Sequence, residues 1–155
     1  MPQWRRWIGR RLAGETGSAS LEFITTGLIL LLPLVYLVLS VAAIQGGALA
    51  VEGAARQAVR VYVQSGTEAE AAARAERAIR FALADAGLEM LEPTVNVTCS
   101  PHPAACLSRR GLVTVSVAVT VPLPLVPQVL TIAAPLGVPL QASATEQVSR
   151  FWSGQ

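Results

Sequence analysis

The chain has 155 residues, of which 52% are hydrophobic and 14% charged, with a formal net charge of +2. An average soluble domain carries roughly 25% charged residues, so this composition favours a membrane-attached protein over a cytosolic enzyme. The same hydrophobicity excludes a disordered chain. All 12 basic residues are arginines. Because no basic excess remains outside the N-terminus, nucleic-acid binding is set aside.

One long apolar stretch dominates the N-terminal third of the chain. No charged residue occurs from Phe23 to Val51, a run of 29 residues. About 20 apolar residues span a bilayer as a helix, and a proline is tolerated inside such a helix. We therefore predict a transmembrane helix from Phe23 to about Ile44 that contains Pro33. The alternatives are a buried core helix, or a secretory signal cleaved after Ala48-Leu49-Ala50.

The arginines predict the orientation of this helix. Four of them precede the apolar stretch, and the first basic residue after it is Arg56. Basic residues are retained on the cytoplasmic side, so we expect the N-terminus inside and everything after about residue 45 outside. The four leader arginines are Arg5, Arg6, Arg10 and Arg11.

Small residues recur at every fourth position from Ala42 to Ala58, and the helix is predicted to continue past the membrane to about Gln64. Their spacing of four lets helix backbones approach closely, so we predict helix packing there. The alternative is simply an alanine-rich helix. The small positions are Ala42, Gly46, Ala50, Ala54 and Ala58.

A second helix is predicted from Thr67 to about Ala86. Thr67 and Glu70 have the spacing of a capping box, in which each side chain receives a hydrogen bond from the other's backbone. Favourable ion pairs are expected for Glu70 with Arg74 and for Glu76 with Arg80. Its apolar stripe is predicted at Ala75, Ile79, Ala82, Leu83 and Ala86.

After the second helix, the apolar residues recur every 2 residues rather than every 3.6. This alternation predicts strands over residues 94–98, 112–121 and 138–146. Residues 111–145 contain no charge, but their five prolines and Val/Thr alternation argue against a second transmembrane helix. The apolar segment Leu123–Leu136 is expected to pack on a partner or against the membrane. The predicted fold class is α+β, with a small antiparallel sheet.

The two cysteines, Cys99 and Cys106, flank His102. Outside a membrane we favour a disulfide between them. The alternative is a zinc site built from the three side chains and a fourth ligand. No catalytic, phosphate-binding or metalloprotease motif is recognisable, so no cofactor and no small-molecule substrate are expected.

Glu22 needs an explanation, because a carboxylate at the start of an apolar helix is costly in lipid unless it has a partner. A helix dipole offers one explanation. Gly17 stands five residues before it, and Gly17-Ser18 followed by Glu22-Phe23 resembles a type IV prepilin cleavage site. Together with Pro33 and the segment Ala54–Arg60, these residues resemble the N-terminal module of TadE-like proteins, which are pseudopilins of tight-adherence (Flp/Tad) pili.

The resemblance implies a non-enzymatic minor pilin or pilus assembly factor, pseudopilin-like in fold. It implies cleavage between Gly17 and Ser18 by a prepilin peptidase, and assembly through Glu22 and Phe23. Its partners would be membrane lipid and other pilins or assembly proteins, in a bacterial inner membrane. The expected parts are a basic leader (1–17), a pilin-like helix (18–65) and an outer helix with sheet (66–155). The rival hypothesis is an exported enzyme or ligand-binding domain that uses the helix only as an anchor.

Overall fold

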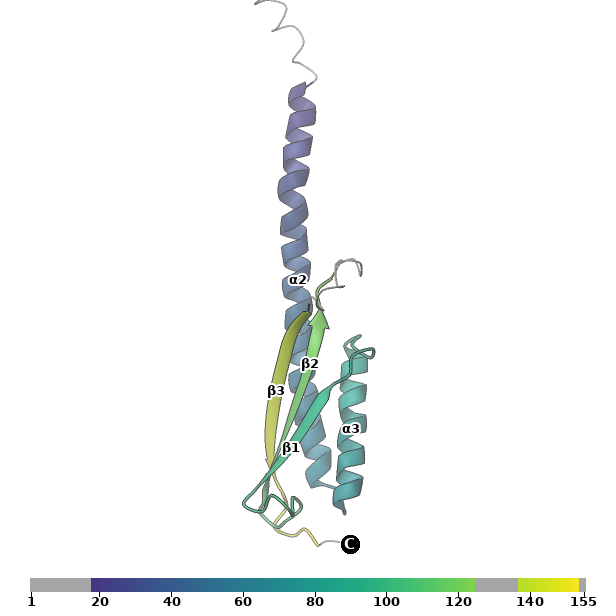
Figure 1. Ribbon diagram of the computed structural model, residues 1–155, viewed down its shortest axis with the longest axis vertical. Coiled ribbons are helices and arrows are strands. Elements are labelled where there is room, and N and C mark those ends of the chain that lie inside the picture. The colour runs from purple at the N-terminus through teal and green to yellow at the C-terminus, as the bar shows by residue number, and fades with distance from the viewer. Residues whose placement is uncertain (1–17, 125–136, 154–155) are drawn as a thin grey trace, which may run out of the picture. The chain divides into compact units, whose positions relative to one another are not determined.

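The computed structural model of the protein describes residues 18–124 and 137–153. The predicted α+β fold is confirmed: two helices are followed by a three-stranded antiparallel sheet (Figure 1). The leader with Gly17, and the segment Leu123–Leu136 from residue 125 onward, lie outside the described residues. The elements are α2 (Ser18–Val63), α3 (Glu68–Asp85), β1 (Thr94–Ser100), β2 (Leu112–Pro122) and β3 (Gly137–Gln147).

The chain divides into two compact units, Met1–Leu39 and Ser40–Gln155. Helix α2 contributes to both, and it remains helical through Pro33. We call the second unit the head. Its core combines residues from the later part of α2, one face of α3 and the central strand. The α2 residues buried in it are Val51, Ala54, Ala55, Ala58, Val59 and Tyr62.

The alternating valines of β2 lie on one face of the sheet, as their period of two predicts, and this face packs in the core with α2 and α3. Strand β2 lies between β1 and β3 (Figure 1). Val115 is paired with Val97 on one side and Ala144 on the other, so apolar side chains share one face across all three strands. The valines of β2 on this face are all buried: Val113, Val115, Val117, Val119 and Val121.

Helix α3 begins with the predicted cap and packs on the core through a slightly different face. Thr67 Oγ1 accepts a hydrogen bond from the Glu70 backbone N–H at 3.2 Å. The Glu70 carboxylate reaches back one residue further than expected, to the Gly66 N–H at 3.2 Å. Both predicted ion pairs form. The expectation that Ala86 belongs to the apolar stripe is wrong: the helix ends at Asp85 and Ala86 is exposed, while Ala71, one turn before Ala75, is buried.

Two adjacent glycines in α2 differ sharply in their surroundings. A Cβ atom on Gly47 would lie 2.9 Å from Val121 Cγ2 and 3.0 Å from Leu140 Cδ1, whereas one on Gly46 would meet nothing within 4 Å. Helix α2 therefore packs tightly on the sheet at Gly47, where a methyl group would require the side chains of Val121 and Leu140 to shift.

This pair gives a matched test of the helix–sheet contact. We expect Gly46→Ala to raise the free energy of unfolding of the head by about 0.5–1 kcal/mol, because alanine removes the entropy cost of glycine in a helix. Gly47→Ala should lower it by about 1 kcal/mol or more, because overpacking outweighs that gain. Urea titration of both variants in detergent measures the difference. Equal effects of the same sign would contradict the described contact.

Candidate functional site

The N-terminal part of α2 presents apolar side chains to its surroundings around the whole helix. The most apolar window of 18 residues has a mean hydropathy of 2.6, and none of it is buried within the chain. The alternative of a buried core helix is therefore wrong. The helix is long and apolar enough to cross a membrane, so this surface needs lipid or another protein to cover it.

Glu22 is the single charged residue of α2 before Glu52. Glu22 is the fifth residue of α2, counting from Ser18. No ion pair among the described residues includes Glu22.

Phe23 is the neighbour of this carboxylate and is 80% exposed. Glu22 is exposed as well, so both residues implied in assembly are accessible from outside the chain. Gly17 lies outside the described residues, and Ser18 is described only as the first residue of the helix. Cleavage between them stays a prediction from the sequence.

The small residues predicted for helix packing fall on two sides of α2. Ala54 is fully buried and Ala50 half-buried, and Ala54 belongs to the core that α2 shares with the sheet and α3. Gly46 is exposed, and a methyl group in place of its hydrogen would meet no neighbour within 4 Å. Ala54 therefore packs inside the head, and a contact of Gly46 with another helix stays a prediction.

A disulfide closes the loop between β1 and β2. Cys99 and Cys106 are bonded, with a Cα–Cα distance of 5.1 Å. Since both sulfur atoms are used in this bond, the zinc alternative is wrong. His102 is exposed in the same loop, and the described residues contain no group of three or more side chains arranged to hold a metal ion.

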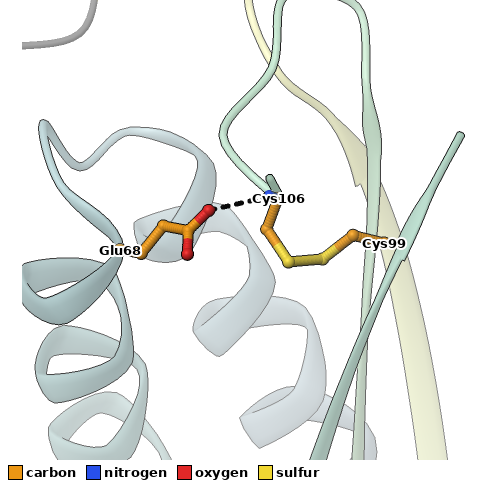
Figure 2. The surroundings of a disulfide bond; sticks show 3 residues. All are labelled: Glu68, Cys99 and Cys106. Carbon is orange, nitrogen blue, oxygen red and sulfur yellow. Dashed lines mark hydrogen bonds between the residues drawn. A yellow bond between two sulfur atoms is a disulfide. The ribbon is translucent and has the colours of Figure 1, made fainter. Parts of the chain in front are cut away.

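The disulfide loop is also attached to the start of α3. The backbone N–H of Cys106 donates a hydrogen bond of 2.8 Å to Glu68 Oε1, across 38 positions of the sequence (Figure 2). Glu68 is the first residue of α3, where a carboxylate is favoured by the helix dipole. A single side chain thus links the helix, the loop and, through the disulfide, strand β1.

The chain that follows β3 returns to the same end of the head. The indole Nε1–H of Trp152 donates to the Ser65 carbonyl at 3.0 Å, and Arg109 Nε donates to the Trp152 carbonyl at 2.8 Å. These contacts join the turn before α3 to the loop before β2 and to the residues after β3. Sequence patterns do not predict them, because they link positions 43 and 87 residues apart.

Comparison of the chain with protein-family models, curated proteins and solved structures finds no match to any of them. The described residues that bear on function form an exposed apolar helix with one carboxylate near its start, and a head whose one end is held together by a disulfide and long-range hydrogen bonds.

Proposed function

We propose that this protein is a membrane-anchored, pseudopilin-like subunit or assembly factor of a Tad-type pilus, and that it acts by packing rather than catalysis. The observation that carries the proposal is the change of role along α2. Its large side chains are exposed up to Leu39, and from Val51 onward its small and apolar side chains form part of the core of the head. One continuous helix therefore supplies both the anchor and a structural element of the head.

Glu22 supports assembly over simple anchoring. An anchor gains nothing from a carboxylate in its apolar part, since the charge makes insertion less favourable. A carboxylate becomes useful if a neighbouring subunit provides a cation. Cleavage after Gly17 would create such a cation, the new amino group of Ser18, about one helical turn before Glu22. The resemblance of Gly17, Glu22 and Phe23 to the prepilin pattern agrees with this chemistry.

The proposed partners follow from the exposed apolar stretch of α2 and from the Gly17–Ser18 bond before it. Membrane lipid would cover the apolar stretch before assembly, and the apolar helices of other pilins or assembly proteins would replace lipid afterwards. A prepilin peptidase would act on the Gly17–Ser18 bond in a bacterial inner membrane. The decisive experiment compares co-purification of pilus components with the wild-type chain and with Glu22→Ala, which should recover fewer of them.

The proposal also predicts the topology. A phosphatase that is active only outside the cytoplasm, fused after Gln155, should be active, because the leader arginines retain the N-terminus in the cytoplasm. A reporter that is active only in the cytoplasm, fused at the same residue, should be inactive and serves as the matched control. The reverse pattern would overturn the proposed orientation.

A further inference from the structure

The ends of strands β2 and β3 project past the rest of the sheet. Strand β1 pairs with β2 no further than Ala118, whereas β2 and β3 stay paired as far as Pro122 and Gly137 (Figure 1). At about 3.4 Å per residue, the part of β2 after Ala118 extends about 13 Å beyond β1. We call this paired end of the two strands the hairpin end: Val119–Pro122 and Gly137–Leu140.

The hairpin end lies against α2, and β3 runs along this helix in the same direction. Leu140 lies against Gly47. Further along both elements, Ser143–Glu146 line one groove together with Arg60. Going back along β3 from Leu140 to Gly137 covers about 10 Å, which corresponds to about seven residues of a helix. The hairpin end therefore reaches the level of about residue 40 of α2.

The burial of α2 agrees with this level. Ser40, Ala43 and Ile44 are half-buried and Gly47 is buried, whereas Val41 is 44% exposed. Spacings of three or four residues place the covered positions on one face of the helix. The membrane span predicted from the sequence continues to about Ile44. One face of α2 is therefore covered over the last turn of that span, where the helix would leave the lipid.

The hairpin end has the composition of a surface in contact with lipid. No charged residue occurs between Gly111 and Thr145 in the sequence, although free strand edges in water are commonly protected by charges. Pro122 and Pro139 are exposed at this end, and a proline has no N–H that would remain unsatisfied in an apolar environment. The exposed apolar stretch of α2 continues to the same level of the helix, so lipid that surrounds this stretch also reaches the hairpin end.

We propose that the hairpin end is a second membrane contact, which enters the lipid interface beside α2. Its depth is limited to the headgroups and the upper acyl chains, because the edge of β3, which has no strand partner among the described residues, retains backbone groups that the hydrocarbon core could not satisfy. Two contacts with the bilayer would fix the rotation of the head about α2. The exposed side of α2 that carries Gly46 would then stay available to neighbouring helices. The inference rests on the membrane anchoring in the proposed function, and not on the pilus role.

Fluorescence quenching in vesicles tests this contact. The full chain carries a thiol-reactive fluorescent label at Thr120→Cys, in phosphatidylcholine vesicles whose lipids bear a nitroxide on the upper acyl chain. Cys99 and Cys106 do not react with the label, because they are bonded to each other. The matched control is Thr145→Cys, an exposed threonine on the same face of the sheet, about 20 Å away along the strands. We expect the nitroxide to quench the label at position 120 about threefold more strongly than at position 145, and aqueous iodide to show the reverse preference.

A label in the apolar stretch separates failure of this proposal from failure of the anchor. Leu34 is 57% exposed there, so a label at Leu34→Cys should be quenched by the nitroxide and not by iodide. If position 34 behaves in this way but position 120 responds like position 145, the hairpin end does not touch lipid and this proposal alone is wrong. If neither quencher reaches position 120, protein covers the hairpin end and the proposal is again wrong. If iodide reaches position 34, α2 is not in the bilayer and the anchor fails as well. The pilus role is tested separately, by co-purification with Glu22→Ala.

Discussion

Replacing both cysteines with serine is expected to lower the free energy of unfolding of the head by about 2–3 kcal/mol. The disulfide joins residues seven apart, and closing a loop of this size removes about that much chain entropy from the unfolded state. The loss should exceed this figure if the loop also releases Glu68, whose carboxylate accepts from the Cys106 N–H. Urea titration followed by Trp152 fluorescence, with Trp4 and Trp7 replaced by phenylalanine, provides the measurement.

Two controls separate the disulfide from the rest of the loop. His102→Ala changes an exposed side chain inside the same loop and should alter stability by less than about 0.5 kcal/mol. Glu68→Gln keeps an acceptor oxygen but removes the charge, so it should cost less than Glu68→Ala. If reductant has no effect on the wild-type chain in the same titration, the disulfide does not stabilise the head.

The elements with a strong local signal are the ones that the sequence predicts well. The β2 prediction succeeds because each valine at period two can reach the same side of a pleated strand, whatever covers it. The prediction of where α3 starts succeeds because the hydrogen bonds of a helix cap are made between residues only a few positions apart. Both signals depend on near neighbours, and both are confirmed with small changes of boundary.

The features that depend on distant contacts are the ones that sequence reasoning misses. Gly46 and Gly47 are equivalent as local signals, and the sheet alone decides which of them is buried. Glu68 is an ordinary residue of a first helical turn until the disulfide loop brings the Cys106 N–H to it.

For the N-terminal part of α2, the structure gives the exposure of the side chains, and the sequence pattern gives the expected partners. The structure shows that the apolar side chains are not covered by the chain itself. In the proposed function, lipid covers them first and the helices of other pilins afterwards, and this order is inferred from the sequence pattern around Gly17 and Glu22. An experiment on these two residues therefore has the greatest weight for function.

Glu22→Ala is expected to leave the protein in the membrane and to reduce co-purification of other pilus components about tenfold or more. Membrane insertion should not suffer, because removing a charge makes it more favourable. Assembly should suffer, because a desolvated carboxylate would lose its cationic partner on the neighbouring subunit. Glu52→Ala is the matched control: it removes a carboxylate from the same helix, at an exposed ion pair with Arg56, and should change co-purification little. Equal recovery of partners with wild type and Glu22→Ala would contradict the proposed role.

Gly17→Leu tests the step that would create this cation. A branched side chain should not fit a peptidase site shaped for glycine, so the full chain of 155 residues should accumulate, whereas the wild type should begin at Ser18. N-terminal sequencing of protein extracted from membranes measures both. If processing creates the partner of Glu22, then Gly17→Leu should lose the same components as Glu22→Ala, and combining the two changes should add little further loss. A wild-type chain that begins at Met1 or Pro2 would rule out cleavage, and one that begins at Val51 would favour a secreted protein over a pilus subunit.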